Sequence, residues 1–141
     1  MMDPMEKFES NGHFFFGPND ELDRVCNAPK KGVGVFIVYE LKNGRVTMVY
    51  IGSAGKITQA GKKKIGKEGL YGSLVNGMQF DQPRWISWKE KLKAEKIEAL
   101  DVYWCETFDE NNADIPAAIE GIMMQQHYDI LGRLPKWNNE F

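Results

Sequence analysis

The carboxylate of Glu120 has the surroundings that most favour chemistry in this sequence. It lies in a helix that we predict from Asp114, a residue able to cap a helix, to Gly132. At about 100° per residue, Met123 and His127 lie on the same side of this helix as Glu120. A carboxylate among apolar neighbours needs a basic partner, hydrogen-bond donors or a metal ion. The sequence therefore leaves two alternatives for Glu120, a salt bridge with a lysine or a place as ligand of a divalent metal.

Two tyrosines lie on neighbouring predicted strands and can form a small polar site. Tyr39 ends an apolar run over 33–39, and Tyr50 belongs to a second run over 46–51. Asn43 and Gly44 between them favour a hairpin turn, because both residue types tolerate a positive φ. Glycines and lysines follow Tyr50 directly. The alternative for both tyrosines is that they are ordinary half-buried strand residues.

The net charge of −2 hides an uneven distribution of charged side chains. Residues 30–96 have a net charge of +9, whereas residues 1–29 have −4 and residues 97–141 have −7. A basic segment suits a polyanion, because each neutralised phosphate releases counterions. The alternative is a solvated lysine-rich surface. The side chains of this segment that we expect to contact nucleic-acid phosphates are Lys56, Lys62, Lys63, Lys64, Arg84 and Lys89.

The last residues of the sequence combine apolar anchors with an amide. Trp137 and Phe141 can dock this segment, which would otherwise fray, and Asn138 lies between them. We therefore expect the side chain of Asn138 to have a fixed position. The alternative is simple packing of the terminus.

The order of predicted elements indicates an α+β fold, a small, largely antiparallel three-stranded sheet flanked by helices. We predict strands over 33–39, 46–51 and 100–107, a mobile loop over 52–69, and helices over 70–76, from Pro83 and from Asp114. The apolar face of the middle helix is predicted as Trp85, Trp88 and Leu92. One globular domain over 32–141 follows an N-terminal extension over 1–31, which holds an apolar Phe14–Phe16 run and a short helix near 19–26.

Composition excludes several classes of protein and site. No run of 18 apolar residues is present, and the polar first residues are not those of a signal peptide, so we expect a cytoplasmic protein without a membrane partner. Cys26 and Cys105 are far apart and form no zinc-binding motif, which indicates reduced thiols. With only two histidines, a histidine-rich metal site is excluded. Gly55-Lys56 is not a phosphate-binding P-loop, because Ile57 stands where a Ser or Thr would hold magnesium.

The ordered motifs from residue 32 to residue 141 resemble the GIY-YIG nuclease family. The string Tyr50-Ile51-Gly52 matches the Tyr-Ile-Gly strand of that family, and Gly34-Val35-Phe36 holds the place of its Gly-x-Tyr strand. A later helix of the family carries a metal-binding glutamate, which matches Glu120. An asparagine near the end matches Asn138, with Asn139 as the alternative.

Two positions depart from the family pattern. Phe36 stands where the first tyrosine is expected, and Ser73 stands where a helical arginine is expected. Tyr39 is the alternative to Phe36, but three residues along a regular strand turn it to the opposite face unless a bulge intervenes. The alternative cations to the arginine are Lys67, Lys64 and Arg84.

The resemblance implies a metal-dependent endonuclease that hydrolyses nucleic-acid phosphodiester bonds, here expected of DNA, with RNA as the alternative. It implies a single Mg²⁺ or Mn²⁺ ion held by Glu120, with Tyr50 orienting the attacking water and Asn138 completing the site. Tyr39 and Lys67 are the remaining candidate catalytic residues. The resemblance leaves the oligomeric state open.

Two other functions remain as alternatives. A non-catalytic nucleic-acid-binding module could keep this fold without the tyrosine and the arginine that Phe36 and Ser73 replace. A protein-interaction domain could instead present Trp85, Trp88 and Trp104 at a contact surface.

Overall fold

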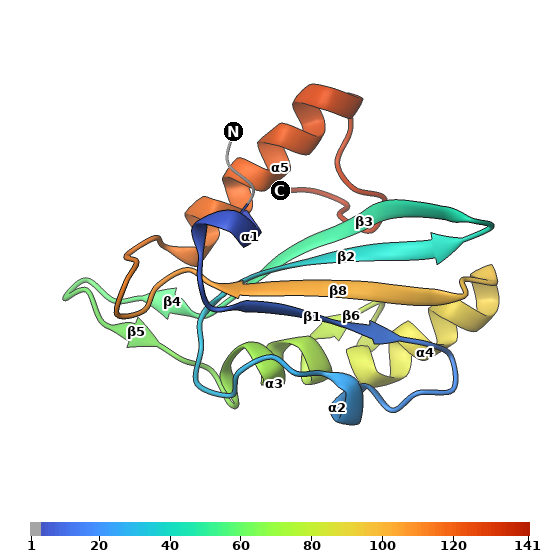
Figure 1. Cartoon of the computed structure of the whole chain (residues 1–141), viewed down its shortest axis with the longest axis horizontal. Coiled ribbons are helices and arrows are strands. Elements are labelled where there is room, and N and C mark those ends of the chain that lie inside the picture. Colours follow the sequence, from blue (N-terminus) through green and yellow to red (C-terminus); the bar gives the residue numbers. More distant parts are fainter. Residues whose placement is uncertain (1–3) are drawn as a thin grey trace.

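Four antiparallel strands form the central sheet in the order β1-β8-β2-β3 (Figure 1). They are β1 (Asn11–Phe16), β2 (Gly34–Lys42), β3 (Arg45–Ala54) and β8 (Ala99–Glu106). The computed structural model describes residues 4–141, so the first three residues of the predicted extension lie outside the described residues. The predicted α+β class is confirmed, with one strand more than the three predicted. The additional strand is β1, whose residues we had placed in the extension, and Phe14 and Phe16 on it are buried.

The hairpin of β2 and β3 has the predicted turn and an unpredicted bulge. Asn43 and Gly44 have φ values of 53° and 73°, as the turn requires. The pairing register of β2 and β3 shifts between Val38 and Tyr39, because Val38 pairs with Tyr50 and Tyr39 pairs with Met48. The unpaired extra residue is therefore on β3, and β2 keeps a regular register with β8.

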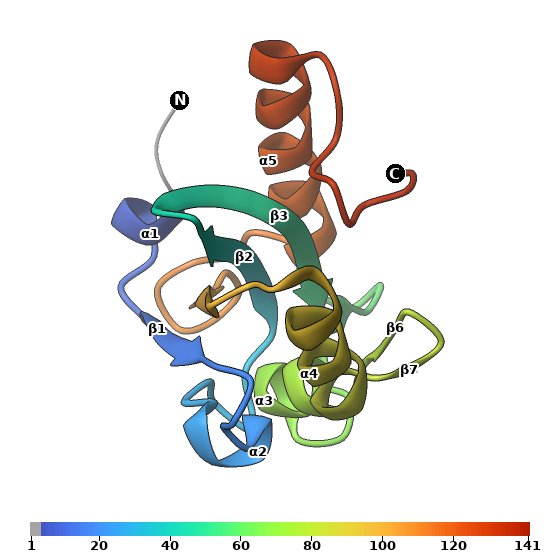
Figure 2. The ribbon, with the colours of Figure 1, turned by 90° about the vertical axis from the view of Figure 1, so that its right-hand side faces the viewer.

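Helices cover both faces of the sheet (Figures 1 and 2). One face packs against α2 (Leu22–Val25), α3 (Gly69–Asn76) and α4 (Arg84–Glu95) around a core that includes Phe36, Trp88 and Leu100. The other face packs against α5 (Pro116–Leu131), and α1 (Pro4–Lys7) lies on the same side. The core on that side includes Ile37, Ile51 and Met123. Within residues 4–141, no helix has both the length and the apolar character needed to cross a membrane.

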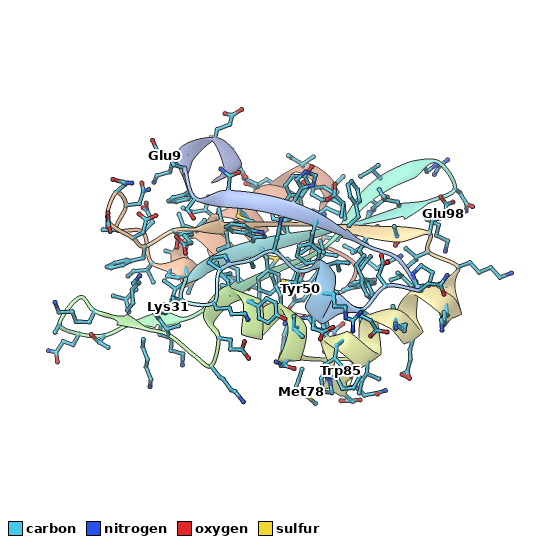
Figure 3. The ribbon with its side chains drawn as sticks, turned by 60° about the horizontal axis from the view of Figure 1, so that its bottom comes forward. Glu9, Lys31, Tyr50, Met78, Trp85 and Glu98 are labelled. Carbon is cyan, nitrogen blue, oxygen red and sulfur yellow. The ribbon has the colours of Figure 1, made fainter. Side chains whose placement is uncertain are left out.

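The N-terminal ends of α4 and α5 differ from the predictions. Trp85, predicted on the apolar face of α4, is 48% exposed, because that helix begins at Arg84 and packs through Trp88 and Leu92. Asp114 does not cap α5; its carboxylate instead forms an ion pair with Lys7 at 3.0 Å. Since Trp88 and Trp104 are buried, the proposed tryptophan contact surface reduces to Trp85 alone (Figure 3).

Two short ribbons were not predicted, and the first of them forms within a segment predicted as a mobile loop. Within the predicted loop over 52–69, β4 (Lys56–Ile57) pairs with β5 (Lys63–Lys64) in an antiparallel ribbon that projects from the body of the molecule (Figure 1). A second ribbon, β6 (Met78–Gln79) and β7 (Gln82–Pro83), joins α3 to α4. Both ribbons therefore flank α3 in the sequence, one before it and one after it.

Candidate functional site

An open pocket of about 380 Å³ lies where β3 ends beside α3. The helix contributes its residues with small side chains, since Gly69, Gly72, Ser73 and Asn76 follow one another at helical spacing. The close packing around the pocket requires glycine at Gly72, because a Cβ atom there would lie 2.0 Å from the backbone oxygen of Lys67. The full lining is Ser53, Ala54, Gly55, Gly66, Lys67, Gly69, Gly72, Ser73, Asn76 and Gly77.

Glu120 reaches this pocket through Ser53. The hydroxyl of Ser53, at the end of β3, donates a hydrogen bond of 2.6 Å to Oε1 of Glu120 on α5. Burial raises the pKa of the Glu120 carboxyl above its usual value, and the hydrogen bond from Ser53 acts in the opposite direction. Among the described residues, no Lys or Arg forms an ion pair with Glu120. The salt-bridge alternative is therefore wrong for residues 4–141.

The donor set around Glu120 fits a metal ion that keeps most of its water. Within the described chain, no group of three or more His, Cys, Asp or Glu side chains converges on one point. Glu120 accepts the Ser53 hydrogen bond at Oε1, which leaves Oε2 as a possible metal ligand. Mg²⁺ is commonly held by one or two carboxylates, several waters and the phosphate of a substrate. The residues present thus suit Mg²⁺ or Mn²⁺ better than Zn²⁺, which needs three or four protein ligands.

Arg84 lies outside the pocket lining and contacts the backbone of Ser73, which lines the pocket. Its guanidinium donates to the backbone oxygen of Ser73 at 2.6 Å and to Oε1 of Gln79 at 2.9 Å. Gly77 is required here, because a Cβ atom on it would lie 2.3 Å from the backbone oxygen of Ser73 and 2.2 Å from Nη1 of Arg84. Arg84 is only 5% exposed, and this burial lowers its pKa. The guanidinium of Arg84 therefore reaches the helix position at which the family arginine was expected.

Tyr50 is joined to the pocket through Arg84. Nη2 of Arg84 donates to the Tyr50 hydroxyl at 3.4 Å, and the guanidinium carbon lies 5.5 Å from the centre of the Tyr50 ring. A guanidinium can only donate hydrogen bonds, so the Tyr50 oxygen accepts and its own proton points elsewhere. The Phe36 ring lies beside Tyr50, with the two ring centres 6.1 Å apart. Tyr50 itself does not line the pocket.

Tyr39 does not join Tyr50. It packs with the core on the α5 side of the sheet, where its ring meets Tyr103 edge-on at 5.6 Å. The bulge that could have turned Tyr39 belongs to β3, so Tyr39 keeps the face that regular alternation gives it. The expectation that Tyr39 takes the role of the first family tyrosine is therefore not supported by its position.

Asn138 is held against the backbone of β3. Its Oδ1 accepts from the amide of Ile51, and its Nδ2 donates to the oxygen of Ile51, both at 3.0 Å. The amide of Trp137 also donates to the oxygen of Val49 at 2.8 Å. The last residues thus pair with the free edge of β3, and Asn138 has the fixed position that we predicted. These contacts explain that position by a structural role, and Asn139 is exposed.

The predicted phosphate-binding side chains fall into separate regions. Lys67 lines the pocket, and Lys56 with Lys62, Lys63 and Lys64 is exposed on the projecting ribbon. Lys89 lies on α4 and pairs with Glu21 at 3.5 Å, and Arg84 is buried. The ribbon lysines therefore lie on the element that leads to Lys67 at the pocket, whereas Lys89 lies on α4 and is paired with Glu21.

Ser53 is the site residue that sequence reasoning missed. It follows Ile51 at a spacing of two and so faces α5, but no sequence pattern pairs this strand position with Glu120, 67 residues away. Scans against protein-family models and searches of curated proteins and solved structures gave no match to this chain. The GIY-YIG resemblance accordingly depends on the residues described above.

Proposed function

We propose that this protein is a metal-dependent endonuclease that hydrolyses phosphodiester bonds of DNA with a GIY-YIG type of site. The observation that carries the proposal is the pocket at the end of β3. Ser53 connects this pocket to the half-buried carboxylate of Glu120, Lys67 lines it, and Arg84 contacts its Ser73 wall. A small-residue hollow lined by a lysine, with a carboxylate one hydrogen bond away, suits a phosphate with a divalent metal.

Each residue has a separate task in the proposed hydrolysis. Glu120 would hold Mg²⁺ or Mn²⁺, which when bound supplies positive charge for the leaving oxygen. Lys67 neutralises a non-bridging oxygen of the phosphate. Arg84 donates to the Tyr50 hydroxyl and leaves the Tyr50 proton free. Since Tyr50 lies outside the pocket lining, it would orient an attacking water that approaches the phosphate from the Arg84 side.

The test is cleavage of plasmid and branched DNA with Mg²⁺ by the wild type and by Glu120→Gln. The amide of glutamine can still accept the Ser53 hydrogen bond, so the fold is kept while the charge is removed. We expect cleavage to fall by about 100-fold or more, the scale for loss of one strong electrostatic contact. Glu110→Gln, which removes an exposed carboxylate after β8, is the matched control and keeps full activity. Absence of cutting by the wild type, or equal cutting by Glu120→Gln, would reject the proposal.

A non-catalytic nucleic-acid-binding module is the second candidate. It is favoured by Phe36 in place of a tyrosine and by the burial of Arg84, whose donors already bind Ser73 and Gln79. This candidate predicts DNA binding that weakens with salt and no turnover with any divalent metal. The same cleavage assay, read beside a binding measurement, separates the two functions.

A further inference from the structure

The ribbon of β4 and β5 is a concentration of positive charge without local compensation. The segment from 56 to 67 contains no acidic residue and has a net charge of +5. Its cations are Lys56, Lys62, Lys63, Lys64 and Lys67. All five are exposed, and within residues 4–141 none of them forms an ion pair.

The strand pairing places like charges opposite each other. Lys56 pairs directly with Lys64, and Ile57 pairs with Lys63. Like charges at directly opposed positions destabilise an antiparallel pair. The ribbon nevertheless has a defined turn, because the amide of Thr58 donates to the oxygen of Lys62 at 2.8 Å and the Thr58 hydroxyl accepts from the amide of Lys62. A preformed element that carries unneutralised charge is suited to a polyanion.

The lysines lie on both faces of the ribbon. Directly paired residues point to the same face, so Lys56 and Lys64 share one face. Lys63 is the neighbour of Lys64 and points to the opposite face. A ribbon lying on a single strand of nucleic acid needs cations on one face only. Cations on more than one side suit a groove, because the phosphates of both strands border it.

The surroundings of α3 decide from which side a polyanion can approach. Gly66 and Lys67, at the base of the ribbon, line the pocket with Ser53. A separate hollow beside α3 is lined by the carboxylates of Glu21, Asp23 and Glu68 and repels phosphate. Positive charge therefore runs outward from the pocket along the ribbon, whose side chains extend away from the body (Figure 3).

We propose that this ribbon enters the major groove of double-stranded B-form DNA and so presents a neighbouring phosphate to the pocket at Ser53. The major groove of B-DNA, about 12 Å wide, admits a two-stranded ribbon. The major groove of A-form RNA is deep and narrow, so double-stranded RNA is a poorer partner. This inference rests on the proposed function, to which it adds the form of the substrate and the element that recognises it.

The test is binding of a fluorescent 20-base-pair DNA duplex, measured by anisotropy without any divalent metal. The ribbon variant carries Lys62→Gln, Lys63→Gln and Lys64→Gln. We expect its affinity to fall by about tenfold and the salt slope of log K to shrink by about 2.7, or about 0.9 for each phosphate contact. The matched control carries Lys42→Gln, Arg45→Gln and Lys93→Gln, which remove equal charge from the opposite end of the sheet and from α4. We expect its affinity to change less than twofold.

The comparison of probes decides between forms of nucleic acid. The wild type is expected to bind the DNA duplex at least tenfold more tightly than the same single strand or an RNA duplex of that sequence. Equal losses in the two triple variants, equal affinity for the three probes, or no duplex binding at all would overturn the groove proposal. Thermal unfolding verifies that both variants fold. Because these measurements need no metal, ribbon-dependent binding without cleavage rejects only the endonuclease, and cleavage with ribbon-independent binding rejects only the groove proposal.

Discussion

At the scale of single residues, the ionisation of Glu120 depends on one hydroxyl group. Burial disfavours its charged form, and the only hydrogen bond that it accepts from the described residues comes from Ser53. A carboxyl whose native pKa lies above the unfolded value adds stability at acid pH, and this stability is lost as the pH rises through the native pKa. At a pH above the native pKa, the ionised Glu120 therefore lowers the free energy of unfolding until a cation neutralises it.

The variant Ser53→Ala is expected to move the acid limb of the activity profile to higher pH. Removal of the hydrogen bond that lowers the pKa of Glu120 leaves the raising effect of burial unopposed. A hydrogen bond to a charged group is worth about 1.5–3 kcal/mol, so the loss of kcat/KM approaches about tenfold below the limb. Above the limb the loss is small. The measurement is kcat/KM between pH 5 and pH 9, and Ser73→Ala, which keeps the backbone oxygen that binds Arg84, is expected to leave the limb in place.

At the scale of elements, the edge strand β3 organises the site. Its bulge places Val49 and Tyr50 together on the α3–α4 side, whereas Ser53 near its end faces α5. The strand thereby connects a tyrosine and a glutamate that lie on opposite faces of the sheet. Its outer edge is covered by the last residues of the sequence, which bind Val49 and Ile51.

The variant Asn138→Ala is expected to loosen this cover and to destabilise the fold. The backbone amide and oxygen of Ile51 would both lose their partner, a loss of about 1–3 kcal/mol in the free energy of unfolding. Denaturant unfolding measures the change, and faster hydrogen exchange at the Ile51 amide locates it. The exposed neighbour Asn139→Ala is the control and should have no effect. Lost cleavage with unchanged stability would instead indicate that Asn138 acts on the substrate.

At the scale of the whole molecule, two cores share one sheet and are expected to unfold together. Cys26 belongs to the core on the α3–α4 side and Cys105 to the core on the α5 side. Both cysteines are buried, neither forms a disulfide, and burial raises the pKa of the Cys26 thiol to about 11. Each thiol can therefore report on the opening of its own core.

We expect neither thiol to react with a thiol-specific reagent in the native protein at pH 8 over about one hour, because both are enclosed. In increasing denaturant, the two labelling rates should rise along the same curve, which mass spectrometry of peptides can resolve. Labelling of Cys26 at lower denaturant than Cys105 would show that the α3–α4 side opens by itself.

Features that depend on near neighbours along the chain were predictable from the residues alone. Apolar runs and the Asn43-Gly44 pair specified the β2–β3 hairpin, helical spacing specified α3 and α5, and charge counting located the basic segment in which the ribbon lies. These patterns are readable because backbone preferences and side-chain periodicity are local. They correctly indicated the α+β class and a fixed position for Asn138.

Contacts between distant residues, in contrast, depend on packing in three dimensions. Strand β1 pairs with β8, which follows about 90 residues later in the sequence, so no local pattern predicts that β1 belongs to the sheet. Arg84 likewise contacts Tyr50 across a separation of 34 residues. Ser53 met Glu120, and Asn138 met Ile51, across 67 and 87 residues. Such contacts depend on how helices pack on the two faces of the sheet and on the bulge in β3, and a one-residue change in register would undo them. The hairpin that carries Tyr50 was therefore readable from the sequence, whereas the pocket around its end depended on packing.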